Sequence, residues 1–350
     1  MELVQVVRRF CPFGGMEGYV WQLAHHLVDQ NFSVRIVCEQ CESGASPNIQ
    51  IDRLPEHRRG PRWYALSRFS NEVWNWRRRA KRRRMLVHAH EFIECADMLT
   101  FHTTVHGWGE AAWYKRLDPS WHFNQWIERR AVCSTQLRAL VPVSNLLQNQ
   151  LAQSYPDTHC ELEPSITPGV EGELASESAS GANRPKAIGF IGREWKRKGL
   201  QRVMDIFRNL KNTHEDLRLV IAGVPREEIA PLIEGMESEV DVLGWIQDRK
   251  RFYDKIHLLI HPARLEAFGM VITEAMAAGV RVLVSDQVGA KSEISRGQGE
   301  VLSLDGGIEK WAACSGSLLR QSDEKVPAYS RPWEVVAQDY QKLYQQIWKS

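Results

Sequence analysis

The sequence predicts an α/β protein of two domains, each built on a parallel sheet, and three features lead to that class. Short apolar runs rich in β-branched residues alternate with segments of helical periodicity in both halves of the chain, as in β-α-β units. A length of 350 residues exceeds a typical single hydrophobic core. The segment 171–185, EGELASESASGANRP, is small and polar, which is typical of a linker. We therefore expect domains at residues 1–170 and 186–330.

The composition is that of an ordinary globular protein, with 43% apolar and 25% charged residues and a formal net charge of +2. Its seven cysteines follow no disulfide-rich pattern, and the pair Cys38 and Cys41 has no second pair at metal-ligand spacing. With a strand-like run directly at the start, these features predict a reduced, cytoplasmic setting. No apolar run approaches the ~20 residues that span a bilayer, so any membrane contact is expected to be peripheral.

The first half is expected to begin with a strand at residues 3–7, followed by the turn CPFGGME and a helix. The apolar positions of that helix follow the helical period at Val20, Leu23, Ala24, Leu27 and Val28. Gly14 and Gly15 let the backbone approach a ligand at the helix start, although a tight turn without any ligand explains them equally well. Further strands are expected at residues 33–38, 85–90 and 140–144, the last ending in Ser144, a helix cap.

Residues 53–84 are rich in arginine and aromatic side chains, among them Trp63, Trp74 and Trp76. The densest part is RRRAKRRR, whose cations are Arg77, Arg78, Arg79, Lys81, Arg82, Arg83 and Arg84. Such a run is usually a solvated helix face. Its density also fits an anionic membrane surface or an anionic glycan. Nucleic-acid binding is a third alternative, but no recognised nucleic-acid module accompanies the run, so we expect none.

Histidines gather at the ends of two strands expected in the first half: His88, His90, His102 and His106. Ligands of doubly wound domains bind at the carboxyl edge of the sheet, so His90, Glu91 or His106 is a candidate for facing a substrate. Burial in the core is the alternative for each histidine.

The second half begins with a strand expected at residues 186–192 and a helix at 199–210, joined by the loop GREWKRKG. Arg193 and Lys198 lie just after the strand, five positions apart around a turn, and suit an anionic group. Lys196 and Arg197 are expected to be solvated.

A β-α-β unit follows at residues 258–285, with Glu266 in its loop and Glu274 on its helix. The backbone N–H groups of Gly269, Met270 and Val271 lie at the start of this helix, which is a favourable place for a phosphate. The two glutamates are interpreted as two ends of a clamp.

Residues 261–279, H-P-x-x-x-E-A-F-G-x-x-x-x-E-A-x-A-x-G, closely resemble the donor-binding motif of the retaining glycosyltransferases of family 4. IGREWKRKGL resembles the family's Gly-Arg and Lys-Gly pair, while FGGME, VPVSN, ITPGVE, VIAG and VLGW follow in its order. A weaker resemblance is to lipopolysaccharide-core hexosyltransferases. The family implies the GT-B architecture, with two Rossmann-like domains whose parallel sheets face each other across a cleft. It also implies that a helix at residues 331–350 crosses back to the first domain.

The resemblance further implies transfer of a hexose from a nucleoside diphosphate sugar, commonly UDP-linked, to a glycan or glycolipid acceptor in cell-surface polysaccharide synthesis, such as that of lipopolysaccharide. Arg193 and Lys198 would stabilise the diphosphate, Glu266 would hold sugar hydroxyls and Glu274 the ribose. Gly14, Gly15 and the helix start at Gly269, Met270 and Val271 would belong to the donor-binding site. His106 would face the sugar or the acceptor.

The resemblance assigns no general base, because in this family the diphosphate itself is thought to deprotonate the acceptor. No D-x-D stands beside the site and cations already occupy the diphosphate position, so we expect neither a metal nor another cofactor. A sugar-nucleotide epimerase or hydrolase on the same fold is the alternative enzyme. The protein is expected to be cytoplasmic, with peripheral attachment to the inner face of the cytoplasmic membrane as a further expectation.

Overall fold

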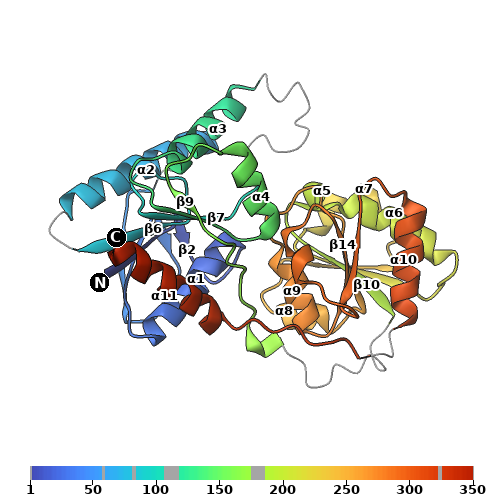
Figure 1. Ribbon diagram of the computed structural model, residues 1–350. Coiled ribbons are helices and arrows are strands. Elements are labelled where there is room, and N and C mark those ends of the chain that lie inside the picture. Colours follow the sequence, from blue (N-terminus) through green and yellow to red (C-terminus); the bar gives the residue numbers. More distant parts are fainter. Residues whose placement is uncertain are drawn as a thin grey trace. The chain divides into compact units, whose positions relative to one another are not determined.

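The computed structural model describes residues 2–56, 60–80, 84–105, 118–174, 186–321 and 325–349. The chain divides into two compact units (Figure 1): unit 1 comprises Met1–Gly169 and Trp333–Ser350, and unit 2 comprises Val170–Pro332. Most of the segment expected to be a linker lies outside the described residues. None of the described helices is long and apolar enough to span a membrane.

Unit 1 is built on a seven-stranded sheet of order β5-β3-β1-β6-β7-β8-β9, in which every pairing is parallel. Its strands are β1 (Glu2–Val6), β3 (Ser33–Cys38), β5 (Ile49–Arg53), β6 (Met85–Ala89), β7 (Met98–Phe101), β8 (Ala139–Pro142) and β9 (Glu161–Leu162). Two short strands, β2 (Arg9–Phe10) and β4 (Gln40–Cys41), pair separately just beyond the ends of β1 and β3.

The helices of unit 1 are α1 (Met16–Asp29), α2 (Arg62–Arg79), α3 (Pro119–Val132), α4 (Asn145–Ser154) and α11 (Trp333–Lys349). Ser144 caps α4 as expected, because its Oγ accepts a hydrogen bond from the Leu147 N–H at 3.1 Å. The C-terminal helix α11 packs against α1 and buries one side of its helical repeat, including Tyr340 and Tyr344.

Unit 2 contains a six-stranded parallel sheet of order β12-β11-β10-β13-β14-β15. The strands are β10 (Ala187–Ile191), β11 (Arg218–Ala222), β12 (Val240–Gly244), β13 (Leu258–His261), β14 (Arg281–Ser285) and β15 (Gly299–Leu302). The helices are α5 (Trp195–Lys198), α6 (Leu200–Lys211), α7 (Arg226–Ile233), α8 (Arg249–Tyr253), α9 (Met270–Ala277) and α10 (Ile308–Arg320).

The central strands β10, β13 and β14 are buried along their whole length, which explains their nearly continuous apolar sequences. Helices α6 and α10 pack together over the core, with Val203, Phe207 and Trp311 fully buried. The α/β class with parallel sheets in two domains is thus confirmed.

Both sheets reverse their strand order beside their first strand. In unit 1, β1 lies between β3 and β6, and in unit 2, β10 lies between β11 and β13. Ligands of open α/β sheets bind outside the carboxyl ends of the strands at this reversal. Binding residues are therefore expected in the loops after β1, β3 and β6 in unit 1, and in the loops after β10 and β13 in unit 2.

Candidate active site

In unit 2, the loop after β10 is pressed against the loop after β13. Gly199 closes the short helix α5 in a left-handed conformation with φ +84°, and a Cβ there would lie 2.4 Å from the carbonyl oxygen of Pro262. The Arg264 N–H donates to the carbonyl of Arg197 at 3.1 Å. This close approach brings the cations of GREWKRKG to the motif that begins at His261.

Glu266 is the centre of a compact charged cluster. Arg197 donates to its Oε2 at 3.2 Å, and Lys198 Nζ lies 3.6 Å from the same oxygen. Burial alone would raise the pKa of Glu266, but His261, Lys198 and Arg197 together hold it well below its usual range. His261 Nε2 lies 3.8 Å away, longer than a hydrogen bond, so we regard the two cations as the stronger cause. The carboxylate of Glu266 is therefore ionised at neutral pH.

Lys198 reaches this cluster by folding back over the end of β10. A Cβ at Gly192 would lie 2.4 Å from Lys198 Cδ, so a larger residue at position 192 would displace the lysine chain from this path. Arg193, by contrast, is exposed and forms no hydrogen bond or ion pair with the described residues. The expectation that Arg197 is solvated is wrong, because its guanidinium binds Glu266 and the carbonyl of Leu265.

Helix α9 starts beside Glu266. Gly269 caps it with φ +92°, and Met270 and Val271 form its first turn, where backbone N–H groups have no partner within the helix. The positive end of the helix dipole adds to the charge of Lys198 at this point. The start of α9 is thus suited to a phosphate group.

Glu274 lies in the next turn of α9 and is only 3% exposed. Arg249 forms an ion pair with its Oε1, and the Tyr253 hydroxyl donates to its Oε2 at 2.8 Å. Both partners belong to α8, outside the motif from His261 to Gly279. No sequence pattern points to them beyond their spacing of one helical turn.

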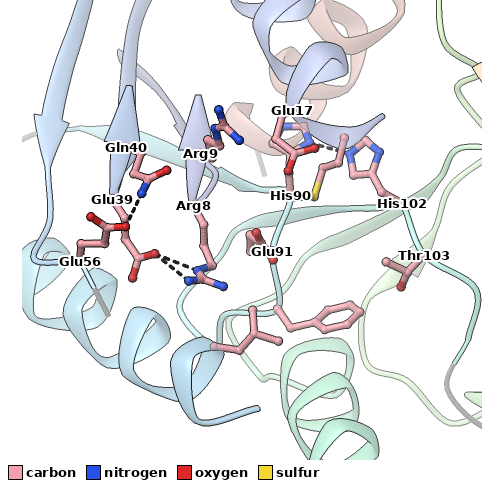
Figure 2. A pocket seen from close by; sticks show the side chains of 13 residues that line it. Arg8, Arg9, Glu17, Glu39, Gln40, Glu56, His90, Glu91, His102 and Thr103 are labelled. Atoms are coloured by element: carbon pink, nitrogen blue, oxygen red, sulfur yellow. Dashed lines mark hydrogen bonds and ion pairs between the residues drawn. The ribbon is translucent and has the colours of Figure 1, made fainter. Parts of the chain in front are cut away.

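In unit 1, a cavity of about 430 Å³ opens at the carboxyl edge of the sheet, at the strand-order reversal (Figure 2). Figure 2 shows polar side chains converging on it from the loops after β1, β3, β6 and β7 and from the start of α1. Its polar lining comprises Arg8, Arg9, Glu17, Glu39, Gln40, Glu56, His90, Glu91, His102 and Thr103. His90 and Glu91, both expected at this edge, lie there, whereas His106 lies outside the described residues.

The two glycines before α1 differ in role. Gly14 has φ +95°, and a Cβ there would lie 2.7 Å from Glu17 Oε2, so the Glu17 carboxylate folds back over the turn. Nothing lies within 4 Å of the corresponding position on Gly15. Close approach therefore requires glycine at position 14, while the open side of Gly15 leaves the backbone accessible.

His90 and His102, which line the cavity, belong together with His88 to a buried network of hydrogen bonds. His90 contacts His102 Nε2 at 2.8 Å and Gln5 Oε1 at 2.7 Å, and His88 contacts the hydroxyls of Tyr344 and Thr100, each at 2.7 Å. Burial lowers the pKa of His102 to about 3, and it lowers the pKa values of His88 and His90 well below the usual range. These histidines are therefore neutral, and His88 has a structural role in the core.

The arginine-rich run is only partly free. Arg77 pairs with Asp97 at 2.9 Å and donates to the carbonyl of Cys95, so it is engaged within unit 1. Arg78, Arg79 and Arg84 are exposed, whereas Lys81, Arg82 and Arg83 lie outside the described residues. Trp76 donates to Asp52 at 2.8 Å, while Trp74 is 37% exposed.

Among the described residues no group of His, Cys, Asp or Glu is arranged to hold a metal ion. Cys38 and Cys41 are both free, and burial raises the pKa of Cys38 to about 12, so its thiol stays protonated.

Two family models together match most of the chain. A model described as Glycosyltransferase Family 4 matches residues 13–162, and one described as Glycosyl transferases group 1 matches residues 185–321. The chain belongs to glycosyltransferase family 4.

Solved glycosyltransferases share the fold of this family 4 member. WaaG, a glycosyltransferase involved in lipopolysaccharide biosynthesis, superposes with a TM-score of 0.80 over 97% of this chain and 95% of that chain, at 18% identity. HepE of Anabaena in complex with UDP and glucose gives a TM-score of 0.69 over 98% and 99% of the two chains, also at 18% identity. The predicted GT-B fold is therefore confirmed.

Matches to curated relatives cover a smaller share of the chain than the matches to solved structures. Alpha-maltose-1-phosphate synthase of Mycobacterium tuberculosis is 24% identical over 210 residues, 53% of each chain. LpcC, a lipopolysaccharide core biosynthesis mannosyltransferase of Rhizobium leguminosarum bv. viciae, is 25% identical over 234 residues, 63% of each chain. The chain thus matches between about half and two thirds of the length of these relatives.

Proposed function

We propose that this family 4 glycosyltransferase transfers a hexose, with retention of configuration, from a UDP-linked donor to a glycan or glycolipid acceptor. The observation that carries the proposal is the arrangement in unit 2, where Glu266 and Glu274 flank the start of α9 with Lys198 beside it. The complex of HepE with UDP and glucose supports the choice of nucleotide. The names of WaaG and LpcC support a place in lipopolysaccharide or other cell-surface polysaccharide synthesis.

Lys198 and Arg193 are proposed to stabilise the negative charge that develops on the leaving diphosphate. As the glycosidic bond breaks, negative charge accumulates on the diphosphate, and preorganised donors stabilise it most where water is excluded. Lys198, held at 16% side-chain exposure, and the first N–H groups of α9 meet that requirement. Arg193 has no partner among the described residues to give up before it binds a phosphate. With these cations in place, we propose that the reaction needs no metal.

Glu266 is suited to accept hydrogen bonds from hydroxyls of the donor sugar. Its low pKa keeps it ionised, so it acts as an acceptor and not as a proton donor to the leaving group. Glu274, four residues beyond Met270 in the second turn of α9, is proposed to accept the ribose hydroxyls. Neither carboxylate is assigned as a general base.

The cavity of unit 1 is proposed to bind the acceptor. Carboxylates, arginines and a threonine around a volume of about 430 Å³ provide the acceptors and donors that orient sugar hydroxyls. Glu17 and Glu91, on two different loops, are the residues that we expect to contact those hydroxyls.

The exposed side of α2 and α3 is proposed to meet the inner face of the cytoplasmic membrane. The two helices pack together, and their aromatic side chains Tyr64, Trp74, Phe123 and Trp126 are 37–48% exposed. Aromatic rings of this kind settle at the headgroup level, while Arg78 and Arg79 would attract anionic lipids. A lipid-linked acceptor would then be met at the membrane surface.

A panel of nucleotide sugars tests the proposed function. A ligand at a hundred times its dissociation constant stabilises a protein by about 2.7 kcal/mol, which raises the unfolding temperature measurably. We expect UDP-hexoses to produce this rise, and GDP-, ADP- and CDP-sugars to produce less.

Product analysis with the best donor then separates the alternatives. Labelled sugar appearing in a glycan acceptor, with the donor's anomeric configuration, supports a retaining transferase. Release of free sugar alone, or its epimerisation on the nucleotide, would replace the proposal by a hydrolase or an epimerase.

A further inference from the structure

The carboxylate of Glu274 is held by two donors that come from one helix. Arg249 and Tyr253 are four residues apart on α8, so both side chains project from the same face of the helix. Arg249 binds Oε1 and Tyr253 binds Oε2, so each oxygen of the carboxylate has its own donor. Rotation of the carboxylate about its terminal bond would break both hydrogen bonds at once.

The environment of each donor suits this task. Tyr253 is fully buried, and burial together with the charge of Glu274 raises its pKa well above the ordinary value, so its hydroxyl keeps its proton. That hydroxyl also lies 3.1 Å from the carbonyl of Val271, which fixes it against the first turn of α9. Arg249 balances the charge of a carboxylate that is 97% buried, a burial that is costly without a paired cation.

The remaining capacity of the carboxylate matters for binding. Each ionised oxygen can accept a second hydrogen bond, so both oxygens of Glu274 can still bind a hydroxyl while α8 holds them. Two hydroxyls on adjacent carbons, as in a ribose, match two oxygens fixed in one plane. A carboxylate free to rotate would make the same bonds at a greater entropic cost.

We propose that Arg249 and Tyr253 are positioning residues, which fix the Glu274 carboxylate so that it accepts both ribose hydroxyls and so discriminates ribonucleotides from deoxyribonucleotides. The inference rests on the proposed function, since it concerns the nucleotide of the same site. Neither residue belongs to the motif that runs from His261 to Gly279. The side chain of Arg249 is 31% exposed, while the Glu274 side chain that it pairs with is 4% exposed.

Calorimetric titration of the full chain with UDP and 2′-deoxy-UDP tests the inference, with GDP and 2′-deoxy-GDP as a second pair. A hydrogen bond to a charged group contributes about 1.5–3 kcal/mol, so the wild type is expected to bind the ribonucleotide ~10–100-fold more tightly. In Tyr253→Phe and Arg249→Met this ratio should fall to about threefold or less, by weaker binding of the ribonucleotide alone. Arg249→Lys should restore part of the ratio, and Arg251→Met, an exposed arginine on the same helix, should leave it unchanged.

The variants separate positioning from general support of the fold. Equal losses for both nucleotides in Tyr253→Phe, a substitution that keeps the ring, would leave the ratio intact and overturn the inference. A wild type that binds both nucleotides of a pair equally well would also overturn it, while the proposed function would stand. A wild type that binds none of the four nucleotides would contradict the proposed function itself.

Discussion

The carboxyl edges of the two sheets have the same topology but different chemistry. In unit 2, Lys198 and Arg197 converge on Glu266, and the site is charged at neutral pH. In unit 1, the cavity is lined by side chains of both charges, among them Arg8 and Glu39, which pair at 2.9 Å, while His90 and His102 are neutral because burial suppresses their protonation. Strand order thus fixes where a site lies, whereas the residues after each strand fix its charge and its hydrogen-bonding groups. On these grounds we propose that unit 2 binds the diphosphate and that unit 1 binds the hydroxyl-bearing acceptor.

The largest expected effect is the loss of turnover when the cations at the unit 2 site are removed. Lys198→Ala and Arg193→Ala are each expected to lower turnover by roughly 10²–10³, the range for losing one preorganised charge-stabilising group. Lys196→Ala, an exposed lysine of the same loop, is the control. Steady-state rates with the purified variants measure the effect, and near-normal turnover in both would remove the diphosphate role of these residues.

Substitution in the unit 1 cavity should change a different constant. Glu17→Gln is expected to raise KM for the acceptor by ~10-fold or more, since it weakens hydrogen bonds from hydroxyls to a charged oxygen. Binding of UDP should not change. Asp29→Asn, at the exposed end of the same helix, is the control. Weaker UDP binding in Glu17→Gln with an unchanged acceptor KM would reverse the assignment of the two sites.

Acid should distinguish the two units by their buried histidines. The pKa values of His88, His90 and His102 are depressed in the folded chain, so their contribution is complete above the unfolded value of about 6.5 and is lost as pH falls below it. Each of these histidines lowers the free energy of unfolding by up to about 1.4 kcal/mol for every pH unit below that value. Unit 2 has one comparable histidine, His261, among the described residues.

Hydrogen exchange between pH 7.5 and pH 5, corrected for the intrinsic rate, measures this difference. Protection of β6 and β7 should fall more than that of β10 and β13, and His102→Gln should reduce the acid sensitivity of unit 1. Equal loss of protection in both sheets would contradict the account of the histidines.

Membrane attachment is the smallest expected effect. Each exposed arginine near an anionic surface contributes about 1 kcal/mol, or roughly fivefold in affinity. Arg78→Ser and Arg79→Ser should therefore weaken co-sedimentation with anionic vesicles at low salt, and so should joint replacement of Arg82, Arg83 and Arg84. Arg251→Ser, in unit 2, is the control. If the wild type did not bind these vesicles at low salt, the membrane role would be contradicted, and docking of an anionic glycan would remain as the hypothesis for the arginine-rich segment.

The sequence predicted unit 2 better than unit 1, and the reason lies in locality. Glu266, the start of α9 and Glu274 fall within one continuous β-α-β unit, so apolar runs and one glycine were enough to place them. The network of unit 1 joins Gln5, His88, Thr100 and Tyr344, which come from three strands and the C-terminal helix. No local pattern reveals a network spread over 340 positions.

The residues that sequence reasoning missed in unit 2 are those that reach the site from elsewhere. Arg197 looked solvated because its direction depends on the single turn of α5, closed by Gly199. Arg249 and Tyr253 come from a helix more than twenty positions before Glu274. Spacing alone cannot show that α8 packs against α9.

The most direct test of the central claim is calorimetric titration of Glu266→Ala and Glu274→Ala with UDP and with the best UDP-hexose. Glu274→Ala should weaken both ligands alike, because the nucleotide carries the ribose in each. Glu266→Ala should weaken the UDP-hexose by ~10-fold or more and leave UDP nearly unchanged, because only the donor carries the sugar hydroxyls. Equal losses of both ligands in both variants would contradict a clamp with separate ends for the ribose and the sugar.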